Sequence, residues 1–301
     1  MVLLIQQRPH LHCTVAKREE FYDKFDSKLR HIPHLYNFKF NSKASLKCFC
    51  SKNETTHEAL QGFSALPRDA PWDNDTAWST MALYIFSLHI PLSFGSLSLV
   101  SQLMHMPVLD PQTKALSRLT IQTLEFFVTL LLLKLTAKPN YRFRNFFRDN
   151  ELCSKRNWVF ASAFGIGFLF SLAFLTSLLA ERLIGPKQVV NNHVLKEILD
   201  SSNISRAACF IAYCVVTPFL EETVFRGFLL ASISSEMQWQ QAVIVSSAVF
   251  SGAHLSVENS LQLFIIGCVL GCSYCWTGNL RSSILIHSLY NAMTLLLTYL
   301  S

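Results

Sequence analysis

Residues 218–229 read PFLEETVFRGFL, and this stretch decides how the chain is interpreted. Two adjacent carboxylates, Glu221 and Glu222, and one arginine, Arg226, stand in a segment that is otherwise apolar on both sides. Ionisable side chains at membrane depth are costly unless they are paired or face a wet cavity, so they mark functional sites. The stretch therefore predicts a charged site inside a transmembrane helix.

The composition of the whole chain fits a multi-pass membrane protein. Of the 301 residues, 50% are hydrophobic and only 15% are charged, whereas about a quarter are charged in an ordinary soluble domain. The mean hydropathy is +0.29. Apolar segments of about twenty residues recur, which is the length that crosses a bilayer as an α-helix. We expect an all-α, multi-pass transmembrane helix bundle.

About seven segments have the length and apolarity of a transmembrane span. The first contains His89 and Pro91, where a kink is expected because proline interrupts helix hydrogen bonding. Between spans two and three, residues 138–156 alternate basic and aromatic side chains, which predicts an interfacial segment on the positive-inside face. The seven spans are residues 77–104, 115–135, 157–180, 206–235, 239–255, 261–276 and 281–300.

Several residues inside the spans carry further information. Glu125 in span two is either a second catalytic carboxylate or a lone acid that packs against a polar group of another helix. Small residues allow helices to approach closely in a membrane. Gly165 and Gly167 in span three, and the pair Gly267-x-x-x-Gly271 in span six, therefore predict close helix contacts.

The N-terminal region is basic and has no sustained apolar run. Residues 1–52 hold ten Lys/Arg against four Asp/Glu, which accounts for the whole net charge of +6. A basic terminus with hydroxyl residues favours an organelle transit peptide over a secretory signal, although four acids are more than such peptides usually carry. A positive patch confined to the terminus indicates targeting and not nucleic-acid binding. The alternative is a disordered cytosolic tail.

The charged residues of the opening stretch divide by their positions on a helix. Residues four apart share a helix face, so Glu222 and Arg226 can form a buried ion pair. Glu221 is turned about 100° away from that face. The spacing predicts that Glu222 and Arg226 hold the geometry, while Glu221 is free to act on something else.

The same four-residue spacing recurs twice towards the C-terminus. Phe250 precedes His254, and His287 precedes Asn291. One histidine on each of two helices, together with Glu221, lets three helices converge on one site. A carboxylate can take a proton from water, histidine can share that role or donate to a leaving amine, and asparagine with histidine can hold an oxyanion. The set predicts hydrolysis by activated water, with a peptide bond as the obvious target.

Two other interpretations of these residues stay open. Glu221, His254 and His287 are also suitable ligands for Zn²⁺ with a bound water. The chain has no H-E-x-x-H sequence, so a zincin-type site is not supported. Taken alone, E-E-x-x-x-R also fits a structural ion pair or the ion gate of a transporter. No internal repeat or pair of broken helices supports a transporter.

The three motifs in this order resemble the CPBP family of intramembrane endopeptidases, also called the ABI family, which includes the CAAX prenyl proteases. The motifs are E-E-x-x-x-R, F-x-x-x-H and H-x-x-x-N, and the resemblance covers residues 206–301. It implies a membrane helix bundle with an internal cavity. It also implies two partners, the lipid bilayer and a membrane-borne or lipid-modified protein whose peptide bond is cleaved near its C-terminus.

Carried across motif by motif, the resemblance implies a role for each residue. Glu221 is the catalytic carboxylate, and His254 is its partner in activating water. His287 and Asn291 are the oxyanion pair. The residues that support the site are Glu222, Arg226 and Phe250. Both a metalloprotease and a metal-independent glutamate mechanism have been argued for the family, and we expect no metal cofactor, with zinc held by Glu221, His254 and His287 as the alternative.

With its transit-like N-terminus, the chain is also similar to the plant plastid branch of this family. That resemblance implies a thylakoid or envelope membrane of the chloroplast. It also offers an alternative function, a non-proteolytic scaffold or regulator in thylakoid and pigment homeostasis that acts through protein partners. We expect three regions: a transit peptide with a polar or disordered linker at 1–76, N-terminal transmembrane helices and loops at 77–205, and a catalytic core at 206–301.

Overall fold

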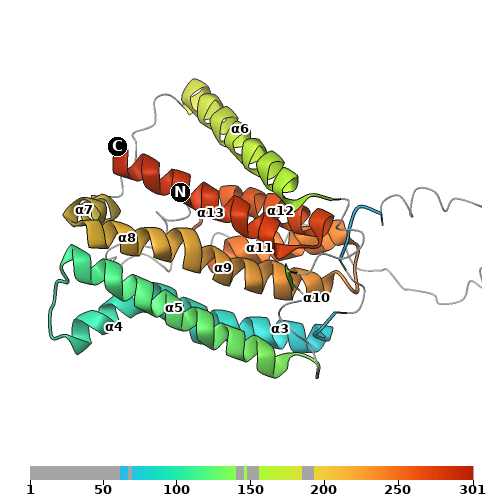
Figure 1. Cartoon of the computed structure of the whole chain (residues 1–301), viewed down its shortest axis with the longest axis horizontal. Helices are drawn as coiled ribbons and strands as arrows, with labels where there is room; N and C mark the ends of the chain where they lie inside the picture. The colour runs from blue at the N-terminus through green and yellow to red at the C-terminus, as the bar shows by residue number, and fades with distance from the viewer. Residues whose placement is uncertain (1–61, 67–69, 140–145, 148–155, 185–192, 301) are drawn as a thin grey trace, which may run out of the picture. The chain divides into compact units, whose positions relative to one another are not determined.

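The computed structural model describes residues 62–66, 70–139, 146–147, 156–184 and 193–300 (Figure 1). Their elements are helices, and no β-strand occurs among them. The predicted all-α class is confirmed. Most of the predicted transit peptide and linker lies outside the described residues. The last residues before the first span nevertheless pack into the bundle, because Trp72 is buried and its ring meets that of Phe228 edge-on at 4.9 Å.

The first span is built of four consecutive helical pieces. Two of them are π-helical, and the second of these begins at Pro91, where the kink was expected. A π turn is wider than an α turn, so it accommodates a proline ring that would clash with the carbonyl one turn earlier. The pieces are α3 (Asn74–Leu83), η2 (Tyr84–His89), η3 (Pro91–Gly95) and α4 (Ser96–Leu103).

The second span is α5 (Pro111–Thr136), and it begins at a conventional cap. The side chain of Asp110 accepts a hydrogen bond from the backbone N–H of Thr113 at 2.9 Å, and Pro111 occupies the first helical position. Hydrogen bonding to Thr113 lowers the pKa of Asp110, so the cap is charged at neutral pH. The next helices are α6 (Trp158–Ile184) and α7 (His193–Ser201).

The charged motif lies in a long helix, residues 203–233, that is interrupted by two π-helical segments. Its pieces are α8 (Asn203–Ile211), η6 (Ala212–Val216), α9 (Thr217–Glu222), η7 (Thr223–Leu230) and α10 (Ala231–Ile233). Within η6 the N–H of Thr217 bonds to the carbonyl of Ala212, five residues earlier. In that register the carbonyl of Tyr213 would pair with residue 218, which is Pro218 and has no N–H. The carbonyl of Tyr213 is therefore left for another donor.

The chain ends with α11 (Trp239–Ala253), α12 (Ser260–Thr277) and α13 (Leu280–Leu300). Six of the described helices are long and apolar enough to cross a membrane, against the expectation of about seven. The predicted span that is not among the six is α11, which has 15 residues. At about 1.5 Å per residue it is roughly 22 Å long, shorter than a hydrocarbon core of about 30 Å.

The helix that carries the motif is the most enclosed of the six. In Asn203–Ile233, 72% of the most apolar window is buried, against 22% in each of the first three spans. Figure 1 shows α8, α9 and α10 running between α5 on one side and α13 on the other, and α9 contacts both of these neighbours. The charges of the motif are thus inside the bundle and away from lipid.

The basic segment at 138–156 is described only in part. Phe146 is buried and stacks on Trp72 with 6.3 Å between ring centroids, so this aromatic is a core residue. Arg156 donates hydrogen bonds to the backbone carbonyls of Gly62, Phe63 and Trp276. The other predicted interfacial residues between 140 and 155, apart from Phe147, lie outside the described residues.

Close helix contacts were predicted at four glycines, and three of the four make them. A Cβ atom added to Gly267 would lie 2.9 Å from the Cβ of Ser247, and one on Gly271 would lie 3.2 Å from Val243. α12 therefore packs directly against the backbone of α11. Gly165 similarly faces Ile286 of α13, whereas nothing lies within 4 Å of a Cβ on Gly167.

We predict that Gly267→Ala destabilises the protein, because the new methyl group meets both the side chain and the backbone of Ser247. The expected loss is about 1–3 kcal/mol, which is usual for overpacking. Unfolding in mixed detergent micelles measures it. Gly167→Ala is the matched control and should unfold like wild type, or slightly later, since alanine is the better helix former. Equal behaviour of the two variants would contradict the contact.

Candidate active site

Glu222, Arg226 and His287 form a fully buried polar network. Arg226 Nη1 donates to Glu222 Oε1 at 2.8 Å, across the four-residue spacing that the sequence suggested. His287 Nδ1 lies 2.8 Å from the same oxygen. The guanidinium of Arg226 also lies 4.4 Å from the ring centroid of Phe250 and donates to the carbonyl of Gly267 at 3.3 Å. One carboxylate oxygen thus joins α13 to the motif helix.

The hydrogen bonds of the two histidines fix which ring nitrogens face Glu221. The carboxylate of Glu222 accepts a hydrogen bond from His287 Nδ1, so Nδ1 carries a proton and Nε2 lies on the other side of the ring. His254 Nδ1 lies 2.8 Å from the carbonyl of Phe250, so it is also protonated. The Nε2 atoms of both rings are therefore the ones available to the site.

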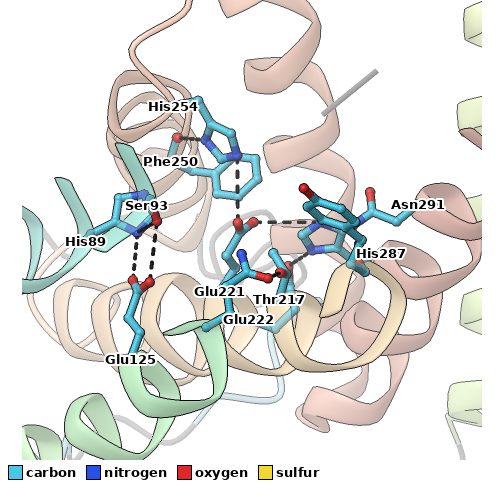
Figure 2. A network of polar contacts seen from close by, with 12 residues as sticks. His89, Ser93, Glu125, Thr217, Glu221, Glu222, Phe250, His254, His287 and Asn291 are labelled. Carbon is cyan, nitrogen blue, oxygen red and sulfur yellow. Dashed lines mark hydrogen bonds and ion pairs between the residues drawn. The ribbon is translucent and has the colours of Figure 1, made fainter. Parts of the chain in front are cut away.

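Glu221 lies between these two nitrogens (Figure 2). Its Oε1 is 3.9 Å from His254 Nε2, and its Oε2 is 3.7 Å from His287 Nε2. Both Nε2 atoms and Glu221 Oε2 are buried and have no hydrogen-bond partner in the described chain. Buried polar groups are normally paired, so three unpaired atoms at one place indicate a built site.

Phe250 supports this arrangement through both its backbone and its ring. Its carbonyl holds His254, and its ring meets the His254 ring at 4.7 Å and the Phe225 ring at 5.1 Å, both nearly edge-on. The side chain is fully buried. The four-residue spacing in F-x-x-x-H is thus the spacing of a backbone carbonyl and the imidazole that it orients.

Asn291 lies one turn beyond His287 on α13, but its amide is engaged elsewhere. Its Nδ2 donates to the carbonyl of Tyr213 at 2.9 Å, the carbonyl that Pro218 leaves free. Its Oδ1 is buried without a partner among the described residues. An oxyanion needs a hydrogen-bond donor. In this conformation one N–H of Asn291 is already used, so only its second N–H could donate to an oxyanion. The sequence spacing gave no sign of the bond to Tyr213.

The donor types at the site would suit a metal, but their arrangement does not. Within the described ranges, no group of three His, Cys, Asp or Glu side chains is positioned to hold an ion. This includes the alternative zinc set of Glu221, His254 and His287.

A second buried cluster adjoins the site, and the sequence analysis did not identify which side chains meet in it. His89 Nδ1 lies 3.0 Å from Glu125 Oε1, with the Tyr84 hydroxyl 3.1 Å from the same ring nitrogen and the Ser93 hydroxyl 3.4 Å from Glu125 Oε2. Glu125 therefore packs against polar groups of another helix, which is the second of the two interpretations drawn from the sequence. His89 and Glu125 are in different spans, so no spacing in the sequence relates them.

The fold and the site define a multi-pass helical membrane protein with carboxylates and histidines gathered at its centre. Residues 203–293 match the family model described as Type II CAAX prenyl endopeptidase Rce1-like. This part of the chain is an Rce1-like domain of the CPBP family, as the three motifs suggested, and it contains every predicted site residue. No curated protein and no solved structure matches the chain.

Removing Arg226 should destabilise the protein strongly, because Glu222 would then be a buried charge held only by His287. We expect Arg226→Met to lower the free energy of unfolding by about 3 kcal/mol or more. Lys138→Met is the control, since Lys138 pairs with Asp73 at the surface at 3.1 Å and surface pairs contribute about 1 kcal/mol at most. The free energy of unfolding of both variants is measured in mixed micelles. Equal losses in the two variants would contradict the account.

Proposed function

We propose that the chain is an intramembrane endopeptidase that hydrolyses a peptide bond in a membrane-associated protein, with water activated by Glu221 and His254. The observation that carries the proposal is the position of Glu221, whose two oxygens face the unpaired Nε2 atoms of two histidines at 3.9 and 3.7 Å. The Rce1-like domain supports the same class of activity.

The spacing between Glu221 and His254 suits a bridging water. A separation of 3.9 Å is too long for a direct hydrogen bond, and one water can bond to both atoms across it. In the proposed reaction Glu221 accepts a proton from that water while the oxygen attacks the carbonyl carbon of the scissile bond. The C–N bond then breaks, and the same proton passes through Glu221 or His254 to the leaving amine.

His287 is the proposed donor to the oxyanion. With Nδ1 donating to Glu222, its Nε2 can donate only when the ring carries both protons. Carboxylates lie on both sides of the ring, with Glu221 Oε2 3.7 Å from Nε2 and Glu222 Oε1 2.8 Å from Nδ1. The second N–H of Asn291 would complete the pair by a small rotation of its amide.

The decisive experiment is cleavage of a prenylated, membrane-anchored reporter by the full chain in proteoliposomes. Glu221→Gln and His254→Ala should each lower kcat/KM by at least about 100-fold, the lower end of what acid–base groups contribute. The controls are Glu236→Gln and His193→Ala, which make the same chemical changes at exposed positions and should keep wild-type rates. Full activity of Glu221→Gln would overturn the proposal.

Metal dependence is tested on the same preparation. We propose a reaction without a resident metal, so a chelator such as phenanthroline should leave the rate unchanged. A loss of activity that added Zn²⁺ restores would instead support the zinc alternative, with Glu221, His254 and His287 as ligands.

We also propose that the basic N-terminal region directs the chain to a chloroplast membrane. The support is its composition, ten Lys/Arg in residues 1–52. The full chain with a C-terminal fluorescent protein should reach plastids in leaf cells, and a variant with those ten residues changed to glutamine should not. Delivery of both proteins to the same non-plastid membrane would contradict this proposed localisation.

A chloroplast localisation is also compatible with the scaffold alternative, in which the protein acts in thylakoid or pigment homeostasis without cleaving a substrate. Complementation separates the two functions. A protease requires Glu221, so Glu221→Gln should fail to complement a null mutant although it accumulates normally. Complementation by that variant would favour the scaffold.

A further inference from the structure

The backbone directly after His254 has an unusual conformation. Leu255 has a φ of 49°, and within the described ranges the other non-glycine residue with a positive φ is His105, in the loop after α4. Residues with a bulky side chain rarely adopt this left-handed region. Backbone strain of this kind gathers at functional sites, and Leu255 adjoins a member of the proposed catalytic pair.

The last turn of α11 is tighter than an α-helix. The backbone N–H of His254 donates to the carbonyl of Ser251 at 3.3 Å. The N–H of Leu255 donates to the carbonyl of Gly252 at 3.0 Å. Both bonds reach back three residues, whereas those of an α-helix reach back four. The four-residue partner of the His254 N–H would be the carbonyl of Phe250, so the tighter turn leaves that carbonyl for another donor.

The ring of His254 uses this carbonyl. Its Nδ1 lies 2.8 Å from the oxygen of Phe250, and its Nε2 faces Glu221 Oε1 at 3.9 Å. Figure 2 shows the two contacts leaving the two nitrogens of the one ring. If α11 continued as an α-helix past His254, the backbone N–H of this residue would compete with its own ring for the oxygen. The way the helix ends therefore decides how the imidazole is held.

Hydrogen bonds on both sides of Leu255 hold the backbone in this conformation. Ser251 Oγ donates to the carbonyl of Ser260 at 2.7 Å, which joins the last turn of α11 to the first residue of α12. Within the loop, Asn259 Nδ2 donates to Ser256 Oγ at 3.0 Å. The side chain of Leu255 is 59% exposed, so packing of that side chain within the chain is not what fixes the turn.

We propose that Leu255 is a positioning residue of the active site and that it acts through its backbone. Its left-handed conformation ends α11 at His254 and leaves the carbonyl of Phe250 to orient the ring, so that Nε2 faces Glu221. Leu255 needs no contact with the substrate for this role. The role rests on the proposed proteolysis, and it accounts for a strained residue directly after the histidine.

Two substitutions separate the backbone of Leu255 from its side chain. Glycine adopts a positive φ freely, so Leu255→Gly should keep kcat/KM within about twofold of wild type. Valine is branched at Cβ and disfavours this region. Leu255→Val should therefore lower kcat at least about 10-fold and leave KM within about twofold, because a displacement of about 1 Å at a catalytic group can cost about 100-fold.

Either of two results would overturn the proposal. The first is a wild-type kcat in Leu255→Val. The second is a loss of activity in Leu255→Gly, which would assign the role to the side chain and not to the backbone.

His105→Val is the matched control. It places the same residue at a φ of 52° and at an exposed position. At that helix end Met104 keeps its four-residue bond to the carbonyl of Val100 at 2.9 Å, so no carbonyl is left for a ring. This variant should cleave like wild type even if it unfolds earlier. Equal losses of activity in His105→Val and Leu255→Val would mean general destabilisation, and the inference would be wrong.

The ring itself gives a readout that does not depend on cleavage. In ¹⁵N-histidine NMR of the full chain in micelles at neutral pH, the Nδ1–H of His254, assigned by its loss in His254→Gln, should be protected from exchange in wild type, Leu255→Gly and His105→Val. It should lose that protection in Leu255→Val. If wild type cleaves nothing but shows this pattern, the proposed function fails and the positioning stands. An unchanged signal in Leu255→Val, in an enzyme that cleaves, overturns the positioning alone.

Discussion

The shared oxygen of Glu222 is the contact on which the rest of the site depends. Arg226 and His287 both lie 2.8 Å from it, so one buried acceptor balances a guanidinium and fixes an imidazole from another helix. A charge in this enclosed position would be very unfavourable without such partners. Because Glu222 is engaged, Glu221 next to it stays free to face the unpaired nitrogens of His254 and His287.

The backbone is adapted around this contact. Pro218 and the π turn before it leave the carbonyl of Tyr213 without a helical partner, and Asn291 occupies it, which ties α13 to the motif helix a second time. Gly267 brings α12 close to α11, and its carbonyl accepts from Arg226. Irregular backbone is tolerated at membrane depth only where protein groups satisfy it, and here Asn291 satisfies the carbonyl of Tyr213.

The sequence predicted the features that repeat along one helix. Apolar length gave the helical class and six of the spans, and four-residue spacings identified the Glu222–Arg226 pair and the residues that meet at Glu221. Two side-chain contacts between helices could not be predicted, because nothing in the sequence relates His89 to Glu125 or Asn291 to Tyr213. The shortness of α11 was also missed, since an apolar run continues past His254 while the helix ends at Ala253.

A structure of the full chain in lipid nanodiscs, with an antibody fragment bound to add mass, would test the central claim most directly. The account predicts that Arg226 pairs with Glu222 and that one ordered water bridges Glu221 Oε1 and His254 Nε2. It would be contradicted if Glu221 were the partner of Arg226, or if Glu221 turned towards lipid and away from both histidines.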